Sequence, residues 1–424
     1  MATRASMDET HFARRKPRCR LCGRSLHTIF ADLGATPLAN SYVRPEDRSQ
    51  SERLYPLRVF ICDDCHLAQV EAVVPPEAIF SRYDYFSSYS DSLLTQSKAF
   101  ALESVRSLGL SPGDRVIEVA SNDGYLLQYF MERGMDVLGI EPAANVAAVA
   151  TSRGVPTHVT FFGAATARAL AAQGRRAKLI VANNVIAHVP DLHDFISGFD
   201  PLLEPGGTVS IECHHLLSLL QFRQFDTIYH EHMQYFSLRT LRRALAAHGL
   251  RVFDVERLPT QGGSLRVRVC REHDLVREER PAVAETLAAE DAAGLSARDT
   301  YARFGQEMEV VRTGLIAFLD AARWAGTSVA CYGAAAKGNT LLNYCGIDTS
   351  RISFAVDRSP HKQGLLLPGS RIPIYDPDTV KVRRPDYLLI LPWNIQDEIM
   401  AQMSYIRDWG GRFVVPIPAL RVIP

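Results

Sequence analysis

Residues 116–124, Val-Ile-Glu-Val-Ala-Ser-Asn-Asp-Gly, constrain the fold of this chain more than any other stretch. The side chains of Val116, Ile117 and Val119 favour a strand, and the small residues that follow favour a tight turn. Residues 125–127 then begin a helix-like run. A strand, a turn and a helix N-terminus in succession are typical of α/β sheets, which bind ligands at the carboxyl ends of their strands.

This turn favours a cationic ligand over a dinucleotide. A dinucleotide site would read Gly-x-Gly-x-x-Gly, and here only the last glycine is present. A carboxylate at Glu118 would repel a pyrophosphate and suits a sulfonium. The pattern resembles the first motif of class I S-adenosylmethionine (SAM) methyltransferases, with alanine at position 120 where that family more often has glycine. The resemblance implies SAM contacts from Glu118, Ala120, Ser121, Asn122 and Gly124.

A second acid follows at the expected distance. Residues 136–141 read as the next strand and end in Glu141, 23 residues after Glu118, where an α/β nucleotide site places its ribose-binding carboxylate. The alternative is an ordinary doubly wound domain with an acid at a strand end. In either case the pattern predicts a doubly wound α/β domain with further strands at residues 178–183, 207–213 and 264–271.

Three more residues of this domain are candidates for the ligand site. Asn183 and His188 come at and after the end of the third expected strand, a position that favours binding or catalysis over packing. Phe162 follows another phenylalanine and could frame the adenine of SAM, although two aromatic residues in a row are also typical of a core.

Four of the eight cysteines form two Cys-x-x-Cys pairs, Cys19/Cys22 and Cys62/Cys65. Two tight turns that each offer two sulfurs predict a tetrahedral Zn²⁺ site. Four thiolates leave no open position for water, so we expect this zinc to be structural. A redox-active Cys-x-x-Cys is the alternative, which the matched pair disfavours.

Charge and hydropathy argue against nucleic acid and membranes as partners. The chain has 47 basic and 47 acidic residues, so no net field attracts a polyanion. Its N-terminus has no apolar signal-like core, and no apolar run approaches ~18 residues. We therefore expect a cytoplasmic protein, a monomer or weak oligomer, that acts on a small molecule.

Ionisable and polar side chains are most closely spaced in residues 226–236, Asp-Thr-Ile-Tyr-His-Glu-His-Met-Gln-Tyr-Phe. A buried strand is a poor explanation, because each buried polar group would need a partner. A solvated loop, a His-x-His metal site and an acid/base site beside SAM are the three readings. Histidine titrates near neutrality and Glu231 could fix its tautomer, which favours the acid/base site.

A second strand–turn–helix pattern begins at residue 328 and predicts a C-terminal Rossmann-like α/β unit. Its turn is not a P-loop, yet it could present backbone N–H groups and Lys337 to a diphosphate. A dehydrogenase-like cofactor site is the alternative. The residues that we expect to contact a ligand here are Lys337, Asn339, Asp357, Arg358, Trp393 and Asn394.

The two cysteine pairs, Glu118–Gly124, the Phe225–His232 block and Gln261-Gly-Gly-Ser-Leu-Arg266 together resemble SAM-dependent C-methyltransferases of nucleotide-linked keto-deoxysugars in antibiotic pathways. The resemblance covers essentially the whole chain. It implies that His232 is the catalytic base, supported by the side chains of Tyr83, His188, Tyr229 and Glu231. Tyr83 belongs to an aromatic segment that could equally be a packed interdomain joint or a lid over the site.

We expect three parts: a zinc-binding domain at 1–80, a class I SAM methyltransferase domain at 81–280 and a nucleotide-sugar-binding domain at 281–424. The resemblance implies methylation of carbon 3 of a dTDP-4-keto-(amino)deoxysugar through an enolate, whereas the residues alone do not exclude carbon 5. Methylation of oxygen or nitrogen on a similar sugar is the runner-up, and a zinc-dependent nucleic-acid-binding module is a third possibility of a different class.

Overall fold

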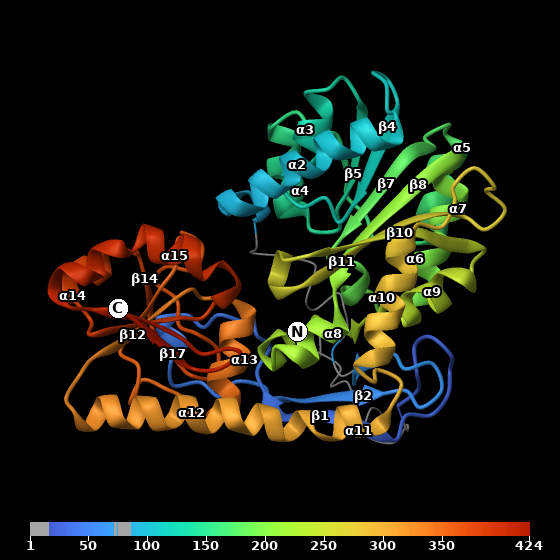
Figure 1. The fold of residues 1–424 in the computed structure, drawn as a ribbon. Helices are drawn as coiled ribbons and strands as arrows, with labels where there is room; N and C mark the ends of the chain where they lie inside the picture. The colour runs from blue at the N-terminus through green and yellow to red at the C-terminus, as the bar shows by residue number, and fades with distance from the viewer. Residues whose placement is uncertain (1–16, 72–73, 75–85) are drawn as a thin grey trace, which may run out of the picture.

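Three β-sheets organise the protein in a computed structural model, which describes residues 17–71, 74 and 86–424. Figure 1 shows a small N-terminal sheet at the base, a large sheet above it and a C-terminal sheet to one side. Among the described residues, no helix combines the length and the apolarity that crossing a membrane requires.

The N-terminal sheet is antiparallel and takes its last strand from far along the chain. Its order is β1-β2-β3-β9, where β9 (Gln234–Tyr235) pairs with β3. The segment that carries the Tyr-His-Glu-His motif is thereby attached to the N-terminal domain. The other strands are β1 (Thr28–Thr36), β2 (Tyr55–Ile61) and β3 (Ala68–Val70).

The large sheet has the order β10-β11-β8-β7-β4-β5-β6, with β4 to β8 parallel and β11 antiparallel to both neighbours. All five strands expected from the sequence are present, and β6 and β10 are additional. The strands are β4 (Arg115–Val119), β5 (Asp136–Ile140), β6 (Thr157–His158), β7 (Ala177–Asn183), β8 (Leu203–His214), β10 (Leu250–Leu258) and β11 (Ser264–Arg271).

Helices cover both faces of this sheet, which explains why β4 is apolar on both sides. Val116 packs with one group of helices and Ile117 with the other, and both are fully buried. One face carries α2 (Asp91–Leu108), α3 (Leu127–Met131) and α4 (Ala144–Ser152). The opposite face carries α5 (Ala164–Ala172), α6 (Leu192–Ser197), α7 (Phe199–Leu202) and α9 (Leu238–Ala246).

The C-terminal sheet has the order β14-β13-β12-β15-β16-β17 and is parallel except for β17. The strands are β12 (Val329–Tyr332), β13 (Ala355–Val356), β14 (Ile374–Tyr375), β15 (Tyr387–Ile390), β16 (Arg412–Val415) and β17 (Arg421–Ile423). Its described helices are α13 (Ala336–Tyr344), α14 (Thr379–Arg383) and α15 (Gln396–Gln402).

Both parallel sheets contain a point where the strand order reverses. β4 pairs with β5 on one side and β7 on the other, and β12 pairs with β13 and β15 in the same way. Ligands of open α/β sheets bind in the crevice at the carboxyl ends of such strands. The fold therefore offers two ligand crevices, one in each sheet.

One long helix joins the N-terminal and C-terminal sheets. α12 (Phe304–Trp324) runs along the base of the molecule, past β1 and the C-terminal sheet (Figure 1). Phe30 of β1 packs against Phe304, with ring centroids 5.2 Å apart, and the two sheets share one apolar core. Before α12 the chain forms α10 (Pro281–Ala292), a turn at Gly294, and α11 (Arg298–Ala302).

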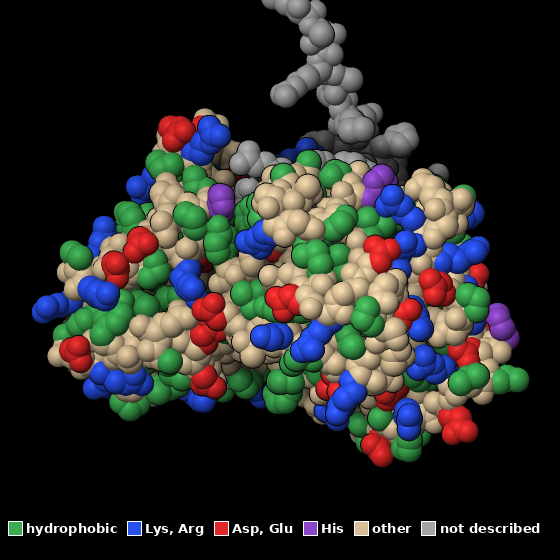
Figure 2. Space-filling model, turned by 90° about the horizontal axis from the view of Figure 1, so that it is seen from above, with side chains coloured by type: hydrophobic (Ala, Val, Ile, Leu, Met, Phe, Trp, Pro, Cys, Tyr) green, Lys and Arg blue, Asp and Glu red, His purple; other side chains and the backbone are tan. Residues whose placement is uncertain are grey.

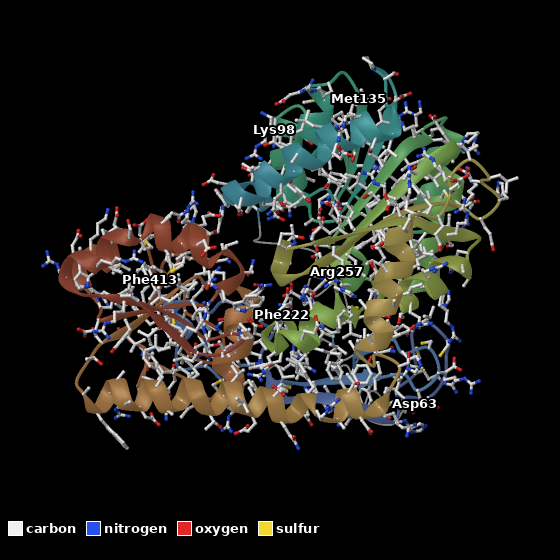
Figure 3. All side chains as sticks on the ribbon, viewed as in Figure 1. Asp63, Lys98, Met135, Phe222, Arg257 and Phe413 are labelled. Carbon is white, nitrogen blue, oxygen red and sulfur yellow. The ribbon has the colours of Figure 1, made fainter. Side chains whose placement is uncertain are left out.

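The space between the two larger sheets is approached by α8 (Leu216–Gln221) and by the β10–β11 hairpin. In Figure 3, Phe222 after α8 and Arg257 of β10 lie between these sheets, whereas Phe413 lies in the C-terminal one. On the face seen in Figure 2, acidic and basic side chains are interspersed, as expected for a chain with no net charge.

Candidate functional site

The four predicted zinc ligands converge. The sulfurs of Cys19, Cys22, Cys62 and Cys65 all lie within 4.8 Å of one another. The shortest separations are 3.4 Å for Cys19–Cys65 and 3.5 Å for Cys22–Cys62. These separations suit a tetrahedral ion with Zn–S bonds of about 2.3 Å. Gln69 Nε2 lies 3.3 Å from the Cys19 sulfur and would stabilise its thiolate.

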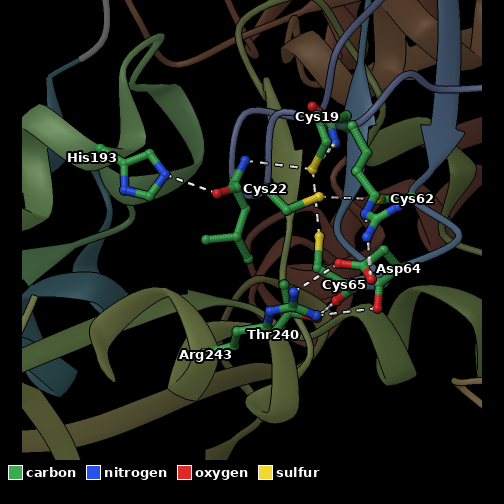
Figure 4. Close-up of polar contacts among 11 residues, drawn as sticks. Cys19, Cys22, Cys62, Asp64, Cys65, His193, Thr240 and Arg243 are labelled. Carbon is green, nitrogen blue, oxygen red and sulfur yellow. Dashed lines mark hydrogen bonds and ion pairs between the residues drawn. The ribbon is translucent and has the colours of Figure 1, made fainter. Parts of the chain in front are cut away.

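The cysteine cluster also attaches the N-terminal domain to the large sheet (Figure 4). Arg243 of α9 binds the Asp64 carboxylate at 2.7 Å, next to Cys65. Thr240 Oγ1 lies 3.4 Å from the Cys65 carbonyl oxygen, and His193 Nε2 lies 2.8 Å from the carbonyl oxygen of Leu21. A metal held here would stabilise this interdomain contact, which is a structural role.

The turn after β4 uses backbone conformations that disfavour ordinary residues. Ala120 has φ 57° and Asn122 has φ 50°, both in the left-handed region. That region costs a residue with a Cβ about 1–2 kcal/mol, which explains why glycine is frequent at the position of Ala120. Gly124 has φ 79°, and a Cβ there would approach Val155 Cγ2 at 3.0 Å.

The two predicted cofactor acids have different surroundings. Glu141 accepts hydrogen bonds from the backbone N–H of Asn122 at 3.0 Å and of Ala143 at 2.8 Å, so its carboxylate holds the turn in place. Glu118 is fully buried, and burial raises its pKa well above the usual value, although a hydrogen bond with Tyr125 opposes this. A cation bound at the turn would favour ionised Glu118.

Of the other residues predicted to bind the cofactor, two have buried polar atoms and one packs in the core. The Asn183 Oδ1 and the Ser121 hydroxyl are buried with no hydrogen-bond partner in the described part of the chain. Both lie near the carboxyl edge of the sheet, where a bound SAM would supply partners. Phe162 packs against Phe195 and Phe199, with ring centroids 5.3 and 5.5 Å away, which is the core role that the sequence also allowed.

His232 and His188 lie against each other, with ring centroids 4.9 Å apart. His232 Nδ1 lies 2.8 Å from the Thr227 carbonyl oxygen, so this nitrogen carries the proton and Nε2 has the lone pair. The Tyr229 hydroxyl lies 2.6 Å from that Nε2 and donates to it. Burial, with His188 as a further cause, lowers the pKa of His232 well below its usual value. The His232 ring is therefore neutral. Tyr83 lies outside the described residues.

The role expected for Glu231 is corrected by the geometry. Thr227, not Glu231, fixes the tautomer of His232, whereas the backbone carbonyl of Glu231 accepts from His188 Nδ1 at 2.8 Å. The Glu231 carboxyl group accepts from Asn40 Nδ2 at 2.7 Å. Burial raises its pKa to about 7, opposed by Asn40 and by the nearby charge of a lysine. Glu231 thus joins the N-terminal loop to the histidine pair.

A buried acid in the same block reaches the C-terminal domain. Asp226 Oδ2 accepts from Trp393 Nε1 at 2.6 Å, and burial raises the Asp226 pKa to about 6. Lys337 donates to Asn394 Oδ1 at 2.7 Å, and its ammonium lies 4.9 Å from the Trp393 ring centroid. Lys337, Trp393 and Asn394 therefore meet at the crevice of the C-terminal sheet, as expected.

The remaining C-terminal candidates have structural partners of their own. Asp357 Oδ2 accepts from the Ala334 N–H at 2.7 Å and so holds the turn after β12. Asn339 is buried and donates to the Ala39 carbonyl oxygen at 2.7 Å. Arg358 is exposed and forms ion pairs at 3.3 Å with an acid of α2 and at 3.7 Å with one of α15.

Sequence reasoning missed two residues that build this site. Asn40 ends an apolar Pro-Leu-Ala stretch, and a lone amide there is the only signal for its contact with Glu231. Asp226 stands inside the most diagnostic block, but its partner Trp393 is far away in the sequence.

The sequence matches three family models in succession: a zinc binding domain at residues 19–80, a methyltransferase domain at 87–255 and a C-methyltransferase C-terminal domain at 259–418. The C-methyltransferase NovU of Streptomyces niveus is 39% identical over 408 residues, which are 96% of this chain and 96% of NovU. The chain belongs to this C-methyltransferase family.

More distant relatives match the central region. A ubiquinone biosynthesis O-methyltransferase of Chelativorans sp. (strain BNC1) is 30% identical over 100 residues, covering 23% of this chain and 40% of that protein. Among solved structures, magnesium protoporphyrin IX methyltransferase (ChlM) of Synechocystis PCC 6803 with bound SAM has a TM-score of 0.33 and 14% identity. It covers 42% of this chain and 79% of its own.

The C-methyltransferase is thus an enzyme of the class I fold with SAM as its methyl donor and a Cys₄ zinc-binding domain, as the sequence predicted. The residues present fit both groups. Four converging thiolates fit Zn²⁺. The Asn183 and Ser121 atoms at the β4 crevice, which have no partner among residues 17–71, 74 and 86–424, fit a polar cofactor.

Proposed function

We propose that this C-methyltransferase acts on carbon 3 of a dTDP-linked 4-keto-6-deoxysugar, with His232 as the base. The observation that carries the proposal is the fixed tautomer of His232, whose Nδ1 donates to Thr227 and whose Nε2 bears the lone pair. A keto group acidifies hydrogen on the adjacent carbon, and a neutral imidazole beside it removes that proton. Methyl transfer to oxygen or nitrogen needs no removal of a proton from carbon, so it demands less of a base.

The charges at the two crevices support a nucleotide sugar. Buried Glu118 of β4 lies just before the turn and suits the sulfonium of SAM. Lys337 is a cation at the other crevice; the hydrogen bond described for it goes to the neutral Asn394, and the Asp226 carboxyl group also interacts with it. An ammonium in such a position suits the diphosphate of a nucleotide.

Tyr229 has two tasks in the reaction. Its hydroxyl occupies the His232 Nε2 lone pair at 2.6 Å, which holds the ring in place before substrate binds. When the sugar enters, the hydroxyl turns to the 4-keto oxygen, and Nε2 becomes free for the proton on carbon 3. The same hydroxyl then stabilises the enolate oxygen, where negative charge develops. SAM supplies the methyl group that carbon 3 takes up.

The test is incubation with SAM and a panel of dTDP-linked 4-keto-6-deoxysugars, followed by NMR of the product. The proposal predicts a new methyl group bonded to carbon 3 and loss of the hydrogen there. A methyl group on oxygen or nitrogen would overturn carbon methylation. No methylation of any panel member, by protein that binds SAM, would overturn the substrate class.

A further inference from the structure

His214 is a third histidine at the site, and the mechanism above does not use it. His214 is the last residue of β8. Two residues earlier in β8, Glu212 pairs with Asn183, the last residue of the neighbouring strand β7. The carboxyl ends of these parallel strands therefore lie side by side, at the edge where open α/β sheets bind ligands. His214 consequently shares this edge with Asn183 and with the loop that carries His188.

The tautomer of His214 follows from its neighbours. Gln224 Nε2 donates to the Gly262 carbonyl oxygen at 2.7 Å, which fixes the orientation of the amide. The Gln224 Oε1 atom then faces His214 Nε2 at 2.7 Å, and an oxygen only accepts. His214 Nε2 therefore carries the proton, and Nδ1 has the lone pair. In His232 the arrangement is reversed, because its Nδ1 is the donor.

The Nδ1 atom of His214 is a buried acceptor to which no residue of the described chain donates. It is enclosed and has no hydrogen-bond partner in the described part of the chain. The nearby ammonium of Lys337 is held by Asn394 Oδ1 at 2.7 Å. Burial lowers the pKa of His214 to about 4, with Lys337 as a further cause, so the ring is neutral and cannot satisfy Nδ1 by protonation. Such an atom is costly unless a ligand supplies an N–H or O–H group.

The side from which that ligand comes is indicated by Trp393. A Cβ on Gly262, the residue that anchors Gln224, would lie 2.4 Å from Trp393 Cη2. Gly262, which orients Gln224 and through it His214, therefore packs against the Trp393 ring next to Lys337, on the C-terminal side of the site. This is the side to which we assign the nucleotide sugar, so the sugar is a better donor than SAM.

We propose that His214 Nδ1 accepts a hydrogen bond from a hydroxyl or amino group of the sugar and so selects substrates that carry this donor near the reacting carbon. This inference rests on the proposed function and adds a specificity-determining contact to it.

Two substitutions test the two ring nitrogens of His214 one at a time. In His214→Asn the amide oxygen can take the place of Nδ1 and keep an acceptor for the sugar. In His214→Gln the longer amide reaches the place of Nε2, keeps the contact with Gln224 and removes the acceptor. We expect His214→Gln to lower kcat/KM by ~10–100-fold and His214→Asn to lower it by less than about 5-fold. The affinity for SAM should be unchanged in both.

Panel sugars that differ by one hydroxyl or amino group give the decisive comparison. For the sugar that lacks the donor, wild type and His214→Gln should turn over at rates within about 3-fold of each other. An equal loss with every sugar, equal losses in both variants, or a weaker affinity for SAM would overturn the inference.

A readout that does not need turnover separates this inference from the proposed function. The ¹⁵N signal of His214 Nδ1 should be that of an unprotonated nitrogen and should move upfield when the donor-bearing dTDP-sugar binds. A bound sugar that leaves this signal in place would overturn the contact even if the sugar is methylated. Lack of methylation with the expected shift would overturn only the reaction.

Discussion

The two strand–turn–helix units of this enzyme have the same architecture and opposite charge. After β4 and after β12 the chain makes a tight turn at the reversal point of a parallel sheet. In each unit the acid that follows the next strand holds the turn: Glu141 accepts from the Asn122 N–H and Asp357 from the Ala334 N–H. A hydrogen bond from a backbone N–H of the turn to a carboxylate therefore occurs in both units.

The difference lies in the ionisable side chain next to each turn. The first unit has buried Glu118 within its strand, whereas the second has Lys337 at the start of its helix. A carboxyl group suits the sulfonium of SAM, and an ammonium suits a diphosphate. Under the proposed function, one architecture therefore binds a cation in the first unit and an anion in the second through single residues. The histidine motif is joined to the C-terminal domain through the hydrogen bond between Asp226 and Trp393.

The largest effect should come from removing the acid in each unit. Glu141→Ala loses two hydrogen bonds of a carboxylate, at about 1.5 kcal/mol or more each, so SAM affinity should fall ~100-fold or more. Asp357→Ala should weaken binding of the dTDP-sugar and leave SAM affinity within about 2-fold. Calorimetric titration of each variant with each ligand tests this cross-over. If both variants lose the same ligand, the two units do not have separate ligands.

Lys337 should matter for the anion alone. Lys337→Met removes the ammonium and should raise the KM for the nucleotide sugar ~10–30-fold, with SAM affinity unchanged. Lys337→Arg keeps the charge and serves as the matched control, with a smaller loss. The salt dependence of KM should flatten in the Met variant only. A KM that Lys337→Met does not alter would remove the diphosphate role.

The histidines between the units should make the enzyme sensitive to acid. Burial lowers the pKa of His188 from 6.5 to about 4. Between pH 6.5 and 4, His188 is therefore protonated in the unfolded chain and neutral in the folded chain. The free energy of unfolding should therefore fall as pH decreases from 6.5 to 4, by up to about 1.4 kcal/mol per pH unit for this group. Urea unfolding at several pH values should show that the free energy of unfolding falls less steeply with decreasing pH in His188→Asn than in wild type. Equal slopes would contradict burial of a neutral His188.

The smallest effect concerns the backbone of the first turn. Ala120 has φ 57°, so Ala120→Gly should relieve strain and stabilise the protein by about 1 kcal/mol. Ala148, exposed within α4, is the matched control, because glycine there should destabilise by roughly the same amount. Thermal unfolding should therefore shift in opposite directions for the two variants. Destabilisation by Ala120→Gly would contradict a left-handed Ala120.

The fold was predictable where its signals are local. Alternating apolar strands and helices predicted both parallel sheets, and two Cys-x-x-Cys pairs predicted the metal cluster. The short β6 and the more polar β10 gave weaker patterns and were not predicted.

The candidate site was predictable in its residue types but not in its contacts. The Tyr-His-Glu-His block pointed to His232, yet the tautomer depends on a backbone carbonyl, that of Thr227, which no side-chain pattern reveals. Asn40 with Glu231 and Asp226 with Trp393 pair residues that are far apart in sequence, so only the folded chain brings them together.

The most direct test of the account is hydrogen exchange at carbon 3 of the dTDP-4-keto-sugar in deuterated water, with the demethylated cofactor in place of SAM. Wild type should incorporate deuterium at carbon 3, because proton removal precedes methyl transfer. His232→Asn should bind both ligands and lose this exchange by ~10²-fold or more. Exchange at the wild-type rate in His232→Asn would show that another group is the base and would contradict the central claim.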